Sequence, residues 1–445
     1  MKEQSEYRLG TQAIVPLILS MSAPIMFTLF IQAMYNIVDS VCVSAYSEHG
    51  LTAISLAFPL QLILTAVGNG TGTGAGILIS HALGMEEKER AAKLVGNGLS
   101  ATLINWLLAL MMLPWLSTYY NSFSETAEVI RQGREYAGIV IALSLFTFVE
   151  STCTRMIQAK GNTVSPMRYQ ALGAVLNIVL DPIMIFGLGP VPRMGIRGAA
   201  LATVIGQAAS MFCAVTILFR QPGWPRRPRL EGRTLLAIYQ SGMPTILTSV
   251  LVSVYITGLN VVLVQFSEDA VTALGIYYKI QSFLLIPLYG LEVGLMPIFS
   301  YNIGANNNKR VWDTFWISLA LATGLTLLGT LLINLFLPGI LTLLSAGPSL
   351  RATATPALRI ISTAFPWFGV TILIPALLQA NHRYRQCLCI VILRQVVLLV
   401  PIAALLSRFG LIYVWLTFPI SEIIAAIVSV WFLILLRRAV PKCAQ

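Results

Sequence analysis

The sequence predicts an all-α polytopic membrane protein with twelve transmembrane helices. Three observations point to this fold class: 56% of the 445 residues are hydrophobic, only 11% are charged, and the apolar residues form long continuous runs. A soluble domain carries about 25% charged residues, so this composition excludes a water-soluble globular fold. The runs do not alternate between apolar and polar residues, which also argues against transmembrane β-strands.

Twelve apolar runs are each long enough to cross a bilayer, which takes about 20 residues. The first six predicted spans are residues 13–44, 51–83, 94–116, 136–158, 169–188 and 198–219. The second six are residues 237–266, 271–301, 314–337, 358–379, 387–406 and 411–436. The first run is too long for the core of a signal peptide, so we expect a retained first helix after a cytoplasmic tail.

The basic residues predict the orientation in the membrane. With the N-terminus inside, 20 of the 29 Lys and Arg residues fall in cytoplasmic segments and 7 in outer segments, while Lys279 and Arg394 lie within helices. The positive-inside rule therefore places both termini in the cytoplasm. The net charge of +11 follows from this topology and favours contact with anionic membrane lipids. We expect no binding to nucleic acid.

Cysteine and histidine usage argues against metal chemistry and disulfide bonds. The six cysteines are scattered along the chain, and there are only three histidines. This pattern contains neither the spacing of a zinc site nor a disulfide framework. We therefore expect no metal site of the His/Cys kind and no cofactor.

The chain repeats itself across a basic, proline-rich stretch at 220–233, which we interpret as a cytoplasmic linker. A shift of 220 residues aligns Pro24 with Pro244 and Gly84 with Gly304, without a gap between them. Each repeat has an even number of helices, so both repeats share one orientation and are related by an axis along the membrane normal.

The repeat predicts two pseudo-symmetric six-helix bundles around a central cavity. The N-terminal lobe comprises residues 1–219 and the C-terminal lobe residues 234–445. Two lobes that enclose a cavity are a common frame for transport by alternating access.

Two acidic residues lie within apolar runs of the first lobe. Asp39 follows Asn36 near the end of the first run, and Asp181 lies in the fifth. A carboxylate near the bilayer centre costs about 3 kcal/mol or more, so it should face protein or water and suggests function. Asn177 precedes Asp181 by one helical turn and projects from the same face. Pro182 removes a backbone hydrogen bond beside the acid, so we expect a hinge there.

The repeat fails at both acids. Asp39 aligns with Leu259, and Asp181 aligns with Val400 after a small loop adjustment. Packing would demand the same residue types in both lobes, so the difference indicates a site that only the first lobe carries. The alternative is that each acid merely satisfies a neighbouring helix.

Other charged and glycine-rich features have structural or cavity-lining interpretations. We expect Arg394 and Glu422 to form a structural ion pair, and the glycine run at 68–76 to let helices approach closely. The predicted substrate cavity contains two tyrosines and three charged residues: Tyr35, Glu150, Tyr255, Lys279 and Glu292.

Several blocks of this chain resemble a known family. They are MYNIVD at 34–39, QAKGN at 158–162, NIVLDPIMIFG at 177–187, MGIRGAALAT at 194–203 and SYNIGA at 300–305. These blocks are similar to those of bacterial multidrug and toxic compound extrusion (MATE) transporters of the multidrug-efflux branch, and the similarity extends over essentially the whole chain.

The resemblance implies an antiporter in the bacterial inner membrane. Such a protein exports small cationic amphiphilic drugs or toxic metabolites in exchange for H⁺ or Na⁺, and we expect a monomer. In this family the acids of helices 1 and 5 bind the coupling cation, and those positions match Asp39, Asp181 and Asn177. The second lobe has no Asp or Glu at 242–265 or 360–380, which favours H⁺ over Na⁺. A sodium site at the same three residues remains the alternative.

Two other functions are compatible with parts of the pattern. A flippase for lipid-linked oligosaccharide shares the two-lobe plan, but such proteins often have extra helices or a cavity rich in basic residues, and here only Lys279 and Arg394 lie within helices. An intramembrane aspartyl protease could use Asp39 and Asp181 as its dyad. The extensive repeat and the lack of a protease motif argue against that enzyme.

Overall fold

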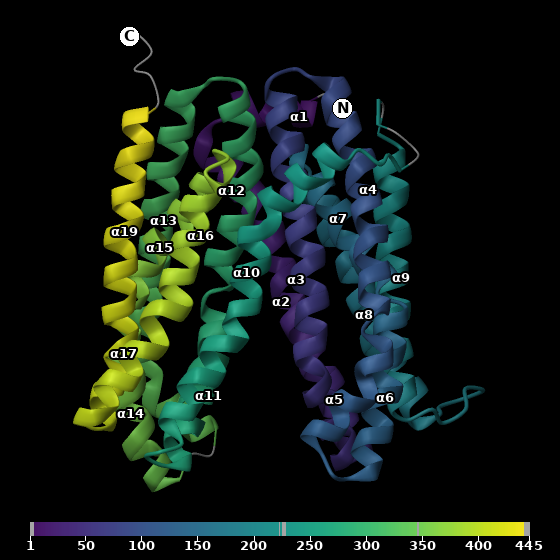
Figure 1. Cartoon of the computed structure of the whole chain (residues 1–445), viewed down its shortest axis with the longest axis vertical. Helices are drawn as coiled ribbons and strands as arrows, with labels where there is room; N and C mark the ends of the chain where they lie inside the picture. Colours follow the sequence, from purple (N-terminus) through teal and green to yellow (C-terminus); the bar gives the residue numbers. More distant parts are fainter. Residues whose placement is uncertain (1–3, 222, 225–227, 345–346, 440–445) are drawn as a thin grey trace. The chain divides into compact units, whose positions relative to one another are not determined.

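The structure is a computed structural model that describes residues 4–221, 223–224, 228–344 and 347–439. The regular structure throughout these residues is helical, which confirms the predicted fold class (Figure 1). The chain begins with a short helix, α1 (Gln4–Thr11), before the first long apolar helix.

Nine stretches of the described chain are helical, long and apolar enough to cross a membrane singly. In chain order they are α2 (Ile14–Tyr46), α3 (Glu48–Gly84), α4 (Lys88–Leu110) continued by α5 (Leu116–Phe123), α8 (Val164–Phe186), α9 (Ile196–Phe219), α10 (Gly232–Leu263), α13 (Asn308–Leu343), α16 (Tyr384–Ile392) continued by α17 (Leu399–Leu406), and α18 (Leu411–Trp415) continued by α19 (Thr417–Ala439).

Three further spans are bent helix pairs. They are α6 (Ala127–Ala142) with α7 (Leu145–Ala159) at 46°, α11 (Glu268–Leu284) with α12 (Ile286–Gly304) at 49°, and α14 (Pro348–Ser362) with α15 (Phe365–Ala380) at 48°. Counting each pair as one span gives up to twelve in the described residues, in agreement with the twelve predicted runs.

Each of these three spans is predicted from the sequence as one continuous apolar run, and the breaks have local structural causes. Pro287 and Pro366 each lie in the first turn after a break, where a proline lacks the amide hydrogen that would continue the preceding helix. At the first break, the Ser144 hydroxyl donates to the carbonyl oxygen of Ile141 at 2.8 Å. Such a bond from a side chain to the preceding turn often bends a helix.

The chain packs as two compact units. Unit 1 comprises the chain up to Gln12 together with Pro24–Ser249 and Ser300–Asn306. Unit 2 comprises Ala13–Ala23, Val250–Phe299 and the chain from Asn307. The helices α2, α10 and α12 are thus each divided between the two units. The assignment of a coupling site to the predicted lobe at 1–219 stays a prediction.

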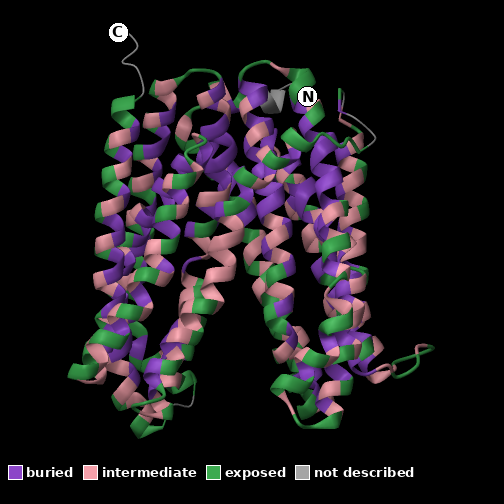
Figure 2. Cartoon of the chain, in the orientation of Figure 1, coloured by how far each residue is buried: buried purple, intermediate pink, exposed green. Residues whose placement is uncertain are grey.

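Many residues along the helices of both units are exposed (Figure 2). Large apolar side chains are among them, as a lipid-facing protein requires. Phe212 on α9 is 63% exposed, and Leu335 on α13 is 66% exposed. In water such surfaces would be unfavourable, whereas lipid tails are as apolar as the side chains themselves.

Glycines of α3 bring helices of unit 1 into backbone contact, which confirms the packing interpretation of the glycine run. A Cβ atom on Gly72 would lie 3.0 Å from the Ser151 carbonyl oxygen on α7. A Cβ atom on Gly74 would lie 2.1 Å from the Ile238 carbonyl oxygen and 2.7 Å from the Gly242 nitrogen on α10. Only glycine allows these approaches, so the helix positions in unit 1 depend on it.

We predict that Gly74→Ala destabilises the protein by about 1–3 kcal/mol, because the new methyl group meets backbone atoms that cannot rotate away. Gly138→Ala on α6 is the matched control, since a Cβ there has nothing within 4 Å. Heating the detergent-solubilised variants and measuring the remaining monodisperse fraction by size exclusion tests this. Equal stability of the two variants would contradict the close packing at Gly74.

Candidate functional site

The two acids singled out in the sequence come together in unit 1. Asp39 lies on α2 and Asp181 on α8, and the two carboxyl groups are close enough to interact electrostatically. Asp181 is 0% exposed, whereas Asp39 is half-buried. Two like charges in such a place repel each other and lose hydration, so this arrangement favours the uptake of a positive charge.

Asn177 links the buried acid to the next helix. Its Nδ2 donates to Asp181 Oδ1 at 3.2 Å, which confirms that the two residues share a face of α8. The same Nδ2 also lies 3.4 Å from Thr203 Oγ1 on α9 and donates to it. Thr203 was missed as a site residue, although it ends the sequence block at 194–203 that carried the resemblance.

Three buried oxygen atoms of this group lack a hydrogen-bond donor. Within the described part of the chain, no donor reaches Asp39 Oδ1, Asp181 Oδ2 or Asn177 Oδ1. A buried polar atom without a partner costs about 1–3 kcal/mol, and more when it is charged. All three atoms are acceptors, so a proton or a hard cation that prefers oxygen ligands fits the set.

Asn36 and Pro182 are the other two residues predicted for this site. The Asn36 side chain is exposed on α2, and among the described residues no hydrogen bond joins it to either acid. Pro182 lies inside α8, which continues past it to Phe186. Its role as a hinge stays a prediction.

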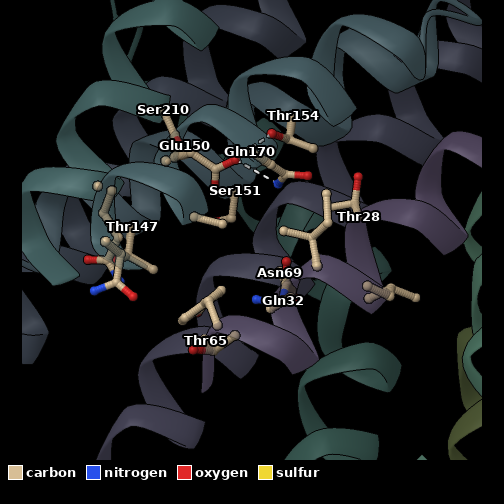
Figure 3. Close-up of a pocket in the computed structure, with 18 of the residues that line it drawn as sticks. Thr28, Gln32, Thr65, Asn69, Thr147, Glu150, Ser151, Thr154, Gln170 and Ser210 are labelled. Carbon is tan, nitrogen blue, oxygen red and sulfur yellow. Dashed lines mark hydrogen bonds between the residues drawn. The ribbon is translucent and has the colours of Figure 1, made fainter. Parts of the chain in front are cut away.

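Unit 1 contains a polar cavity of about 200 Å³ (Figure 3). Asn177, which donates to Asp181, is part of its lining. Residues from α2, α3, α7, α8 and α9 line it, among them Tyr35, Glu150 and Asn177. Most of the remaining lining is hydroxyl and amide side chains: Thr28, Gln32, Thr65, Asn69, Thr147, Ser151, Thr154, Gln158, Gln170, Thr203, Gln207 and Ser210. Tyr35 and Glu150 are predicted from the sequence as cavity residues. The neutral polar residues are not, because no sequence pattern distinguishes them.

Glu150 is held in place by two neighbours. Thr154 Oγ1 donates to Glu150 Oε1 at 2.9 Å, and Gln170 Nε2 on α8 donates to the same oxygen at 2.7 Å (Figure 3). The Thr154 hydroxyl also lies 2.6 Å from the Tyr169 hydroxyl. These contacts fix the carboxyl group between α7 and α8.

The remaining predicted cavity residues lie in unit 2. Tyr255 on α10 packs near Tyr278, with ring centroids 6.1 Å apart. Lys279 is exposed on α11, and Glu292 is half-buried on α12. None of these three lines the cavity in unit 1. Their contribution to a substrate site stays a prediction.

Unit 2 has aliphatic residues where unit 1 has the acids. Leu259, which aligns with Asp39, is 1% exposed. Its neighbour Gly258 packs so tightly on Val400, which aligns with Asp181, that a Cβ atom there would lie 2.6 Å from a Val400 methyl carbon. The helices that carry these two positions thus pack closely at Gly258 and Val400, and the carboxylates at these aligned positions are a feature of unit 1.

The predicted ion pair of unit 2 is confirmed. Arg394 Nε donates to Glu422 Oε1 at 2.5 Å, and Thr371 Oγ1 donates to Glu422 Oε2 at 2.8 Å. Arg394 lies in the π-helical turn Leu393–Leu398 between α16 and α17. Because both charges are buried and paired, this group resembles a structural pair rather than a site for a free ion.

Up to twelve helical spans in the described residues, acids within two of these helices and an adjoining polar cavity are typical of a membrane transporter. The MatE family model matches residues 24–183 and 244–405, well over half of the chain. The protein therefore belongs to the MATE family of membrane transporters. The two matches begin 220 residues apart, the same shift that aligned the sequence repeat.

Similar proteins cover nearly the full length of the chain. The FAD transporter of Shewanella oneidensis is 25% identical over 419 residues, 92% of each chain. The multidrug export protein MepA of Staphylococcus haemolyticus is 24% identical over 450 residues, 98% of this chain and 97% of the relative. The crystal structure of MATE in the bent conformation superposes with a TM-score of 0.92 at 24% identity, covering 98% of each chain.

Removing one partner of the unit 2 ion pair should destabilise the protein strongly. We predict that Glu422→Leu costs about 3–5 kcal/mol, because it leaves the Arg394 guanidinium buried without its counter-charge. The double variant Arg394→Met with Glu422→Leu should recover most of that loss, since neither charge then remains. Thermal unfolding in detergent measures both; a double variant as unstable as the single one would disprove a purely structural pair.

Proposed function

We propose that the protein is a cation-coupled antiporter that exports cationic amphiphilic drugs or toxic metabolites by alternating access. The observation that carries the proposal is the group of buried acceptor oxygens on Asp39, Asp181 and Asn177. The positions of the second repeat that align with the two acids are occupied by Leu259 and Val400. Similarity to relatives that are named multidrug export proteins supports the direction of transport and the breadth of substrates.

The coupling ion is a proton in this proposal, with Na⁺ as the alternative at the same residues. Asn36 completes the predicted coupling site. The stretches 242–265 and 360–380 of the second repeat contain no acid. Glu422, on α19, already has Arg394 as its partner. The carboxyl pair of unit 1 can therefore bind and release a proton without help from a second acidic site.

Coupling follows from electrostatics. As anions, the two acids attract a cation; once protonated, they attract it less. Proton and substrate each weaken the other's binding, and this linkage is reciprocal. Neutralising the pair also removes the repulsion between α2 and α8, which lets α2 repack against α8 near Pro182.

An anionic substrate is the competing possibility. The FAD transporter of Shewanella oneidensis is as similar to this chain as the multidrug relatives are. Arg155 lines the cavity of unit 1 and is the group there that could hold a phosphate.

The proposed setting is the bacterial inner membrane, with both termini in the cytoplasm and membrane lipids around a monomer. The basic residues of the sequence support this orientation through the positive-inside rule.

We expect Asp39→Asn and Asp181→Asn each to abolish drug-dependent proton movement, because an amide cannot bind and release the coupling proton. Fluorescence of a pH-sensitive dye inside proteoliposomes measures the movement. Asp313→Asn is the matched control, since it makes the same change at an exposed position on α13. Normal pumping by both variants would refute the coupling role.

Replacing sodium by choline separates the two coupling ions. Proton coupling predicts that drug export from an efflux-deficient host or from proteoliposomes keeps at least about half its rate without Na⁺. It also predicts that export stops when the pH gradient is collapsed. Export that fails in choline and survives the loss of the pH gradient would identify Na⁺ as the coupling ion.

A further inference from the structure

The cavity of unit 1 contains a carboxyl group that the coupling mechanism does not use. Among the described residues that line it, only Glu150 and Arg155 carry formal charges at neutral pH. Asp39 and Asp181 do not line this cavity, whereas Asn177 does. A ligand in the cavity would therefore meet Glu150 directly and the coupling acids only through Asn177.

One oxygen of Glu150 is available to such a ligand. The hydrogen bonds from Thr154 and Gln170 are both accepted by Oε1. These neutral donors hold the carboxyl group in place without cancelling its charge, and neither of the two hydrogen bonds uses Oε2. A positioned carboxylate with one oxygen left over is suited to accept a bond from a charged donor.

The neutral lining favours a cation that carries hydrogen-bond donors. Thr28, Thr65 and Asn69 are on α2 and α3, while Ser151 and Thr154 are on α7 with Glu150 (Figure 3). Their hydroxyl and amide oxygens can accept bonds from several N–H groups of one ligand.

A quaternary ammonium group has different needs. It offers no N–H donor, and proteins hold it mainly with cages of aromatic rings. Tyr35 is the one aromatic residue among those that line the cavity in the described chain. The cavity therefore lacks the surroundings that such a cation prefers.

We propose that Glu150 is the specificity-determining residue of this cavity and selects cations with N–H donors, such as protonated amines and amidinium groups, over quaternary ammonium groups. This inference rests on the proposed export function and names the substrate group that unit 1 binds.

The dimensions of the cavity agree with a head group rather than a whole drug. Drug-sized ligands occupy cavities of about 300–1,000 Å³, and this one has about 200 Å³. Ile25, Leu29 and Ile31 contribute apolar lining from α2. An amphiphilic amine would place its charged end at Glu150 and its apolar part along these residues.

Arg155 lies on the same helix as Glu150 and opposes a cation electrostatically. Arg155 follows Glu150 by five residues on α7, and its Nη1 donates to Gln158 Oε1 at 3.3 Å. The charge of Arg155 would instead attract an anion. Glu150 and Arg155 therefore favour ligands of opposite charge, and replacing each residue separately distinguishes their effects on binding.

Two toxic amphiphiles with the same tail test the proposal: dodecylamine, which is a protonated primary amine at neutral pH, and dodecyltrimethylammonium. In an efflux-deficient host, wild-type protein should raise the inhibitory concentration of the primary amine roughly tenfold more than that of the quaternary compound, as expected for one bond to a charged group. Glu150→Gln should remove this preference, while Glu150→Asp should keep part of it. Asp313→Asn, at an exposed position outside the cavity, should keep all of it.

The outcomes separate this proposal from the exporter proposal. Equal protection against both compounds by the wild type, or an unchanged preference in Glu150→Gln, overturns the role of Glu150 and leaves export intact. Protection against neither compound overturns both. Efflux of FAD that is lost in Arg155→Gln and retained in Glu150→Gln would identify an anion site instead. The comparison of the two amphiphiles in the wild type needs no variant. It therefore tests the preference for the primary amine even if Glu150→Gln fails to fold.

Discussion

Burial of the Asp181 carboxyl group is the constraint on which the rest of unit 1 depends. The residue is 0% exposed, and within the part of the chain that the structure describes its carboxyl group accepts a hydrogen bond from the neutral amide of Asn177. An isolated buried carboxylate is strongly unfavourable, and a second carboxylate at Asp39 makes it more so. The group is stable when a proton or cation joins it, and that requirement makes it suitable for coupling.

The two units differ in how their buried charges are neutralised. In unit 2 the buried charges of Arg394 and Glu422 neutralise each other, and the positions that correspond to the acids are occupied by Leu259 and Val400. The Arg394–Glu422 pair is neutralised within unit 2. In unit 1, among the described residues, one carboxyl oxygen each of Asp39 and Asp181 has no donor, and the proposed coupling ion would interact with these oxygens.

Asn177 connects the two halves of the proposed chemistry within unit 1. It donates to Asp181 and to Thr203, and it also lines the cavity that contains Glu150. A change in the charge of Asp181 alters the hydrogen bonding of this amide, and the amide is part of the cavity wall. In the proposed function, ion binding and ligand binding would therefore share one side chain, which is a direct physical route for their linkage.

The sequence by itself determined the twelve apolar runs, the repeat and the two acids, because hydrophobic length and the cost of a charge in lipid are properties of the chain that need no knowledge of packing. It also indicated the Arg394–Glu422 pair, since the two opposite charges lie in successive predicted spans. Only the tertiary structure decided that Thr203 meets Asn177, that three oxygens lack donors, and that neutral side chains from five helices form a cavity around Glu150. Such neutral polar residues have no signature along the chain, because their role arises from the close approach of helices that are distant in sequence.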